Sequence, residues 1–244
     1  MIPIYIPTRG IVSITYDNFP DDIKKSVILF TDKILDHIPL EQQILFDGNG
    51  IANKRQACVE HAIMNRYDYM VMVDDDVIIR RIINDNGKLK LSKGPADSNS
   101  YQLFFEDAIH KFESDKNLAI ISDHQKAFMH IKRDSSGIDK FVMHNLNTIK
   151  TSGCIYNRIE IFEDIDFYLQ LFNSGRSSTR TKILSSSNNS KDYVAVSHQR
   201  YIDVFKDWES RFPCNISIAW ETPSIFAGNK NIPVKINIKW RPMK

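Results

Sequence analysis

Three consecutive aspartates, Asp74, Asp75 and Asp76, directly follow an uninterrupted apolar run at residues 69–73. Neighbouring carboxylates repel one another, and a cation bound among them makes the arrangement favourable. In an extended chain residues 74 and 76 point to the same side, so Asp74 and Asp76 can converge on one ion. Oxygen ligands suit Mg²⁺ or Mn²⁺, which commonly bridge a carboxylate to substrate phosphates. We therefore predict a divalent-metal site that holds a diphosphate and neutralises its charge as it leaves.

The alternative for this acidic run is a strand exit that simply stays hydrated. If the metal prediction holds, alanine at Asp74 or Asp76 abolishes turnover. We also expect little loss of folding stability from either substitution, because it relieves like-charge repulsion.

A second acidic cluster, Glu163, Asp164 and Asp166, precedes an apolar stripe with helical spacing. Carboxylates in the first turn of a helix are stabilised by the helix dipole by about 0.3–1 kcal/mol, which accounts for the cluster without any catalysis. The functional interpretation is that Asp164, with Glu163 beside it, is a general base. Its pKa would then be raised toward the working pH, and it would remove the proton of an acceptor hydroxyl.

Three further side chains are candidates for binding phosphate or metal. Arg9 and Arg55 lie near predicted junctions of strand, loop and helix, where a guanidinium can bind phosphate oxygens through two parallel hydrogen bonds. Surface ion pairs are the alternative for both. His198 follows a β-like run and could contact a metal or a diphosphate, although a lone histidine is more often structural.

The elements that must position these residues follow from the hydrophobic pattern. Strands are predicted at residues 2–7, 27–30, 43–46, 69–73, 118–121 and 193–196, and helices at 52–66, 101–112 and 165–172. This alternation is typical of an α/β fold with an open, largely parallel sheet, in which ligands bind at the carboxyl ends of the strands. Asn86-Gly87 predicts a hairpin between residues 77–83 and 88–91. The polar range 174–192 predicts a mobile loop.

The length and composition limit the class of protein. A chain of 244 residues with 42% hydrophobic and 25% charged residues is typical of one globular domain. We expect residues 1–125 to form a nucleotide-sugar and metal half and residues 126–244 an acceptor half. No apolar run approaches a membrane span, and the N-terminus lacks a signal-like leader, so a cytoplasmic protein is expected. The net charge of +2 does not by itself indicate a nucleic-acid partner.

Three segments carry a resemblance to a known family: residues 4–10 (IYIPTRG), 51–55 (IANKR) and 72–76 (MVDDD). They resemble the GT-A glycosyltransferase superfamily, which is marked by an Asp-x-Asp at the end of a central strand. More narrowly, they are similar to the phage TET-associated glycosyltransferases, which are proposed to modify hydroxymethylated pyrimidines in DNA. The resemblance covers residues 2–80 and recurs at 151–153 and 163–175.

The resemblance implies a GT-A, Rossmann-like fold and a role for each matching residue. The nucleotide-sugar pocket would be lined by Pro7, Thr8, Arg9, Asp32, Arg55, Asp74 and Asp75. Asp74 and Asp76 would hold Mn²⁺ or Mg²⁺, with His198 as a third ligand. Asp164 matches the acidic position that inverting members use as base. The acceptor side would include Ser152, Gly153 and Trp240.

The function implied is metal-dependent transfer of a sugar from a nucleotide sugar, a UDP-sugar, to a hydroxyl group. The acceptor would be the hydroxymethyl group of a 5-hydroxymethylpyrimidine in phage DNA, or its glycosylated form, which base flipping could deliver. The tryptophans Trp208, Trp220 and Trp240 could stack on DNA bases or fill a small C-terminal core. A polysaccharide, lipid or protein acceptor, a two-metal phosphoryl-transfer enzyme and a non-enzymatic binding module are the alternatives.

Overall fold

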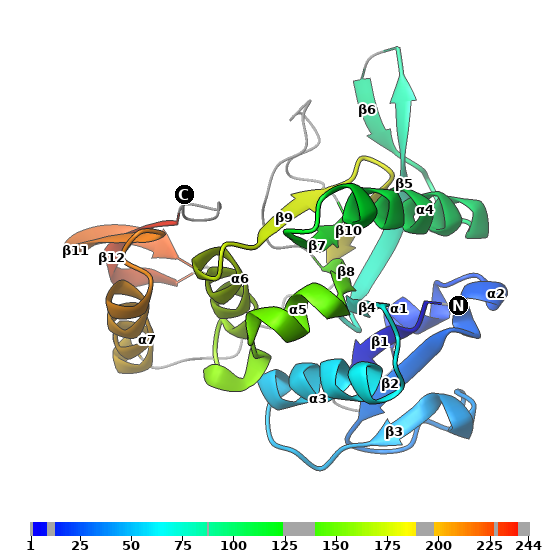
Figure 1. The fold of residues 1–244 in the computed structure, drawn as a ribbon, viewed down its shortest axis with the longest axis horizontal. Coiled ribbons are helices and arrows are strands. Elements are labelled where there is room, and N and C mark those ends of the chain that lie inside the picture. The colour runs from blue at the N-terminus through cyan, green and yellow to red at the C-terminus, as the bar shows by residue number, and fades with distance from the viewer. Residues whose placement is uncertain are drawn as a thin grey trace.

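The chain folds around a seven-stranded sheet flanked by helices (Figure 1). The structure is a computed structural model that describes residues 2–8, 13–86, 88–123, 140–188, 198–226 and 229–238. The sheet order is β3-β2-β1-β4-β8-β7-β9. Its strands are β1 (Ile4–Pro7), β2 (Val27–Thr31), β3 (Gln43–Leu45), β4 (Tyr69–Val73), β7 (Leu118–Ser122), β8 (Phe141–Asn145) and β9 (Ser177–Arg180). All run in the same direction except β8, which is antiparallel to both of its neighbours. The predicted α/β fold with a mostly parallel sheet is confirmed.

The order of the strands reverses between β1 and β4. The chain passes outward from β1 through β2 to β3 and then crosses back to place β4 on the other side of β1. A crevice opens at such a switch point, outside the carboxyl ends of the two strands. Pro7 ends β1 and Val73 ends β4, so Thr8 and Asp74 lie at this edge of the sheet.

Helices cover both faces of the sheet. They are α1 (Ile14–Asp17), α2 (Asp21–Lys24), α3 (Ile51–Met64), α4 (Ser98–Ser114), α5 (Leu146–Ser152), α6 (Glu163–Asn173) and α7 (His198–Arg211), with 3-10 turns η1 (Leu40–Gln42) and η3 (Tyr156–Arg158). On β1, Ile4 and Ile6 join a core with α4, whereas Tyr5 joins a second core with α3, α5 and α6. Strands buried on both faces need apolar residues at every position, which explains the uninterrupted run at residues 69–73.

The predicted hairpin is present. β5 (Val77–Asp85) pairs antiparallel with β6 (Lys88–Leu91), and Asn86 between them has a φ of 52°, in the left-handed region that asparagine tolerates. The root of β5 pairs on its other side with β10 (Leu184–Asn188). The outer part of the hairpin projects from the body of the protein (Figure 1).

The prediction of a loop over residues 174–192 is wrong where β9 and β10 lie. Serine and threonine dominate both strands, and composition alone therefore indicated a loop. Pairing overrides composition here, because β9 extends the main sheet beside β7 and β10 pairs with β5. Ser185 and Ser186 are buried as a result. The strand predicted at 193–196 lies outside the described residues.

A small third core lies at the C-terminal end. It joins α7 to β11 (Ile216–Phe226) and β12 (Asn229–Ile238), and Leu169 links it to α6. Trp208 is fully buried in this core, as the structural alternative for the tryptophans predicted. The side chain of Trp220 and the whole of Trp240 lie outside the described part of the chain. Among the described helices, none has both the length and the apolar character needed to cross a bilayer.

Candidate functional site

The ends of β1 and β4 are joined by a direct side-chain contact at the switch point. The hydroxyl of Thr8 donates a hydrogen bond to Oδ2 of Asp75, at 2.5 Å, and its backbone nitrogen donates to the carbonyl of Phe30. Thr8 is buried, and Pro7 before it completes β1. Burial raises the pKa of Asp75 above its ordinary value, against the lowering effect of the Thr8 hydrogen bond. The structure therefore brings Thr8 and Asp75 into contact, while the role of Pro7, Thr8 and Asp75 in a nucleotide-sugar pocket stays a prediction.

Two cations bind the carboxylate of Asp74. Nη2 of Arg55 lies 2.6 Å from Oδ1, and Nζ of Lys140 lies 2.5 Å from Oδ2. Lys140 reaches this position because it directly precedes β8. That strand runs antiparallel to β4, so its first residue lies beside the last residue of β4. The backbone carbonyl of Lys140 accepts a hydrogen bond from the Asp74 nitrogen. Burial alone would raise the pKa of Asp74, but Arg55 and Lys140 hold it below its ordinary value. Asp74 is therefore an ionised group whose charge is already balanced.

Arg55 also binds the second acidic cluster. Its Nη1 lies 2.6 Å from Oε1 of Glu163, the first residue of α6. Arg55 is only 8% exposed, and its Nε has no hydrogen-bond partner among the described residues. A buried donor without a partner costs free energy unless a ligand or water satisfies it. This guanidinium is thus held by two carboxylates and still has a donor to offer.

A small pocket opens beside Arg55. It is lined by Arg55, Met72, Asp74, Lys140, Val142, Tyr156, Asp164 and Tyr168. The lining combines two cations, two carboxylates and two tyrosines over an apolar floor. Clefts with a few convergent polar groups are the usual form of ligand sites.

The two neighbouring acids of α6 differ in their surroundings. Glu163 is buried, and burial raises its pKa even though Arg55 acts to lower it. Asp164 lines the pocket, and its Oδ1 accepts a hydrogen bond from the Ile165 nitrogen at 2.8 Å. The proposed base therefore faces the pocket, while Glu163 is engaged by Arg55. Both also lie in the first turn of α6, where the helix dipole favours them.

The acidic run does not continue the strand. The chain turns at Asp75 and Asp76, so the alternation of an extended chain does not apply there. Thr15 holds the turn: its hydroxyl oxygen accepts from the Val77 nitrogen and lies 2.6 and 3.0 Å from the carbonyl oxygens of Asp74 and Val77, which share its one hydrogen. The premise that Asp74 and Asp76 share one side of a strand is wrong for this reason.

Asp74 also contributes to folding stability, contrary to the prediction. We expected alanine at Asp74 to relieve repulsion, but Asp74 is the partner of a buried arginine and of Lys140. Removing one member of a buried ion pair leaves an uncompensated charge and costs about 3–5 kcal/mol. Loss of Asp74 therefore destabilises the fold as well as the site.

No three histidine, cysteine, aspartate or glutamate side chains among the described residues form a group that could hold a metal ion. Mg²⁺ and Mn²⁺ in phosphate-binding sites commonly take only one or two carboxylates, with substrate phosphates and water supplying the rest. Asp74 offers the right oxygen donors and Asp76 follows two residues later, half-buried in the turn. The residues fit such an ion provided that Arg55 or Lys140 releases one oxygen of Asp74.

A second charged group lies at the adjacent ends of β1 and β2. Nζ of Lys54, a buried residue of α3, lies 2.6 Å from Oδ1 of Asp32 and donates to the carbonyl of Thr8 at 2.7 Å. The Asp32 side chain is 48% exposed, so its other face is open to a ligand. Sequence reasoning missed Lys54 and Lys140, and the only signal for Lys54 was its place next to Arg55 in residues 51–55.

Ser152 and Gly153 are not among the described residues that line this pocket. Ser152 ends α5, where its hydroxyl donates to the Ile149 carbonyl, and Gly153 follows with a φ of 69°. Their acceptor-side role stays a prediction. His198 begins α7, but its side chain, Arg9 and Trp240 lie outside the described residues.

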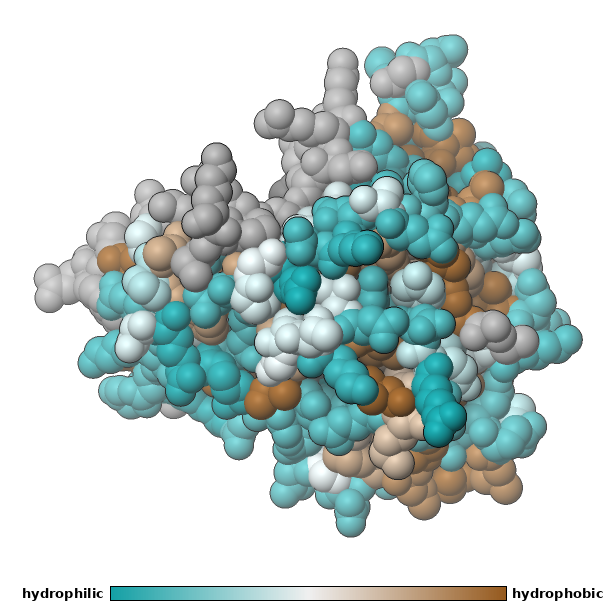
Figure 2. Space-filling model, viewed as in Figure 1, coloured by the Kyte–Doolittle hydropathy of each residue, from teal (hydrophilic) through white to brown (hydrophobic). Residues whose placement is uncertain are grey.

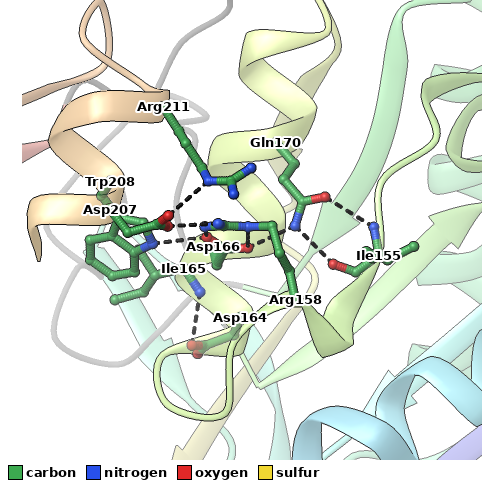
Figure 3. Close-up of polar contacts among 9 residues, drawn as sticks. All are labelled: Ile155, Arg158, Asp164, Ile165, Asp166, Gln170, Asp207, Trp208 and Arg211. Atoms are coloured by element: carbon green, nitrogen blue, oxygen red, sulfur yellow. Dashed lines mark hydrogen bonds and ion pairs between the residues drawn. The ribbon is translucent and has the colours of Figure 1, made fainter. Parts of the chain in front are cut away.

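A partly buried arginine, Arg158, holds α6 to α7 (Figure 3). Arg158 binds Asp166 through Nε, at 2.7 Å, and through Nη2, and it binds Asp207 through Nη1 at 2.6 Å. Asp166, which is fully buried, also accepts from Trp208 Nε1 and Gln170 Nε2. This network fixes the helix that carries Glu163 and Asp164.

Comparison with known proteins places the chain in a family. The model of the TET-Associated Glycosyltransferase family matches residues 2–191. No curated protein matches the sequence. A197 from STIV is similar at 15% identity and a TM-score of 0.45, over 82% of this chain and 92% of that chain. A cytidylyltransferase from Leptospira borgpetersenii serovar Hardjo-bovis is similar at 10% identity and a TM-score of 0.43, over 86% of this chain and 96% of that chain. Similarities at these scores carry no argument about the site.

Proposed function

The chain belongs to the TET-associated glycosyltransferase family, and from that premise we propose that it transfers a sugar from a nucleotide sugar, a UDP-sugar, to a modified base in DNA. The acceptor group is the hydroxymethyl oxygen of a 5-hydroxymethylpyrimidine. A divalent cation, Mn²⁺ or Mg²⁺, assists the reaction. A DNA acceptor implies a cytoplasmic reaction.

The observation that carries the proposal is Arg55, buried between Asp74 and Glu163 at the switch point of the sheet. Arginine binds phosphate oxygens in a fixed planar geometry, and Arg55 lines the pocket. Lys140 adds a second cation on the other oxygen of Asp74. Two cations at one pocket suit a leaving diphosphate, which gains charge as its bond to the sugar breaks.

The nucleotide lies on the β1–β2 side in this proposal. Asp32 and Asp75 there can accept hydrogen bonds from ribose hydroxyls or a base, and Lys54 and Thr8 fix their orientation. Asp74 and Asp76 would hold the cation, which neutralises the diphosphate when bound. Arg55 and Lys140 then exchange contacts with Asp74 for contacts with phosphate.

Asp164 is the general base of the proposed reaction. Its carboxylate lines the pocket and takes the proton of the acceptor hydroxyl. The freed oxygen forms a bond to the anomeric carbon, and the bond from that carbon to the phosphate oxygen breaks, so the electron pair leaves with the nucleoside diphosphate. Tyr156 and Tyr168 in the same lining are buried, and Tyr156 stacks on Phe167, so they form a wall of the pocket.

Two assays with purified protein test this proposal. The first measures Mn²⁺-dependent hydrolysis of UDP-sugars, and the second measures transfer to a duplex that contains 5-hydroxymethylcytosine. An otherwise identical unmodified duplex is the control. We expect transfer to the modified duplex only. Hydrolysis without transfer would reject the DNA acceptor, and phosphodiester cleavage would support a phosphoryl-transfer enzyme instead.

A further inference from the structure

The β5–β6 hairpin carries a concentration of positive charge that the proposed site does not use. Residues 80–93 contain five basic residues and one acidic residue, a formal charge of +4, whereas the whole chain carries +2. The rest of the molecule is therefore net acidic. A charge set apart in this way produces a local positive field that the overall charge conceals.

The outer half of the hairpin packs against no other strand of the described chain. β10 pairs with β5 only at Val77–Arg81, while Ile82–Asp85 pair with β6 alone. A two-stranded ribbon is marginally stable in water and gains little by extending this far. In Figure 1 the ribbon projects clear of the sheet, and in Figure 2 its tip is hydrophilic.

Pairing places three basic residues on one face of this ribbon. Side chains alternate along a strand, so Lys88 and Lys90 share a face of β6. Lys88 pairs with Asp85 and Lys90 pairs with Ile83, so Asp85 and Ile83 share that face. Arg81 lies two residues before Ile83 on β5 and therefore lies on the same face. Arg81, Lys88 and Lys90 are all exposed.

The acidic groups near this face are few. Asp85 contacts Lys90 at 2.5 Å, with both side chains about half exposed, and Asp97 at the start of α4 lies within electrostatic reach of Arg81. Exposed pairs of this kind contribute little and yield readily to another anion. Ile83, 44% exposed, adds apolar surface between the charges.

The opposite face of the ribbon is different. Ile82 is buried, and Leu89 and Leu91 are half-buried. Arg80, which alternates onto that face, is used within the fold, because its guanidinium binds the backbone carbonyls of Ser92 and Lys93. The basic face is therefore free to bind an external partner, whereas the apolar face and Arg80 stabilise the root.

The geometry points to this basic face as a docking surface for the phosphate backbone of duplex DNA. The inference rests on the proposed function for its partner, and the position of the ribbon supports it. β5 begins at Val77, immediately after the acidic turn, so Arg81 to Lys88 lie roughly 15–30 Å from that turn at about 3.3 Å per residue. One turn of duplex DNA spans about 34 Å. A duplex held by the ribbon therefore presents a base to the pocket within one helical turn.

A triple variant, Arg81→Gln with Lys88→Gln and Lys90→Gln, tests the docking surface. The matched control removes the same charge at exposed lysines elsewhere: Lys25→Gln with Lys33→Gln and Lys116→Gln. Fluorescence anisotropy with a 30-base-pair duplex containing 5-hydroxymethylcytosine measures affinity at several salt concentrations. Three lost phosphate contacts should weaken binding roughly 10- to 100-fold at 0.1–0.15 M salt and reduce the slope of log K against log salt by about 2.7. The control variant should change the duplex affinity and the salt slope by no more than about a third of the changes expected for the triple variant.

Activity separates this inference from the proposed function. The triple variant should hydrolyse the nucleotide sugar as the wild type does and show a raised KM for the duplex, and its thermal unfolding should match that of the control. Equal duplex affinity in the triple variant and the wild type would overturn the docking surface. If the wild type transfers no sugar to any duplex but the triple variant still loses DNA binding, the proposed acceptor fails while the docking surface stands.

Discussion

Two arginines of this protein, the buried Arg55 and the partly buried Arg158, each bridge two carboxylates, yet their surroundings differ. Arg158 uses Nε, Nη1 and Nη2 on Asp166 and Asp207, and Asp166 receives further hydrogen bonds from Trp208 and Gln170. Arg55 uses only Nη1 and Nη2, and its Nε has no partner among the described residues.

The difference lies in whether the network is complete. The Arg158 network joins α6 to α7, and each of its three guanidinium nitrogens contacts a carboxylate. The Arg55 network opens onto a pocket and keeps a donor in reserve. A buried ion network with all its groups satisfied specifies structure, whereas one with an open donor beside a pocket is prepared for a ligand.

The largest effect on stability is expected at the closed network. Asp166→Asn replaces a buried carboxylate that accepts from Arg158, Trp208 and Gln170. Breaking a buried charge pair costs about 3–5 kcal/mol, so the free energy of unfolding should fall by that amount in urea denaturation. Asp107→Asn, at a partly exposed ion pair with Lys111 within α4, should cost under about 1 kcal/mol. A loss at Asp166 as small as at Asp107 would mean that this network does not hold the helices together.

A matched pair of substitutions compares the two arginines directly. Lysine keeps the charge but cannot bridge two carboxylates with fixed geometry. We expect Arg55→Lys to lower kcat/KM for sugar transfer by about 10²–10³-fold, the usual cost of losing one positioned donor. Arg158→Lys should lower stability and leave kcat/KM of the folded enzyme within a few-fold of the wild type. Equal losses of activity in the two variants would show that Arg55 and Arg158 do not differ in their contribution to catalysis.

The turn that carries Asp74 gives a smaller expected effect. Thr15→Val removes the hydroxyl that binds the carbonyls of Asp74 and Val77 and the Val77 nitrogen. Leaving such buried groups unsatisfied costs about 1–3 kcal/mol, which chemical denaturation would detect. Thr15→Ser keeps the hydroxyl and should recover most of the loss. If serine is as damaging as valine, the methyl group rather than the hydroxyl matters.

His144 provides a test by pH. This buried residue contacts the Tyr156 hydroxyl at 2.7 Å, and burial lowers its pKa to about 3. The unfolded chain, with a histidine pKa near ~6.5, binds more protons between those values, so stability falls as the pH drops from about 6.5 toward 3. The contribution is about 1.4 kcal/mol per pH unit.

The matching variant isolates that contribution. His144→Gln cannot gain the proton, so its stability should fall less steeply between about pH 6.5 and 4.5. Other groups, such as Asp75 and Glu163, titrate in both proteins and cancel in the difference. Parallel curves for variant and wild type would show that the pKa of His144 in the folded protein is not lowered, because folded and unfolded chains would then gain the proton together.

Most of the elements that were predicted correctly are determined by local sequence. The apolar runs within the described residues, the hairpin around Asn86 and the helical stripe at 101–112 act over short distances, and each became the expected element. Pairing partners far apart in the chain decided the rest. Serine-rich β9 and β10 became strands only because β7 and β5 pair with them.

The residues of the site also divide into those with a local signal in the sequence and those placed by long-range contacts. Asp74, Asp75 and Thr8 were recognisable because polar residues follow buried strands. The contact of Arg55 with Glu163 joins residues 108 positions apart. Lys140 lies beside Asp74 because it precedes β8, an antiparallel strand that was not predicted from the sequence. Neither contact has a local signal, so the balance of charge around Asp74 could not be anticipated.

The central claim is that the pocket at Arg55 and Asp74 carries out the sugar transfer. The most direct measurement is Mn²⁺-dependent transfer from a UDP-sugar to a 5-hydroxymethylcytosine duplex by the wild type and by Asp74→Asn, each confirmed to be folded by circular dichroism at the assay temperature. We expect transfer by the wild type and a loss of at least about 100-fold in the variant. Full turnover by folded Asp74→Asn protein would contradict the assignment of this pocket.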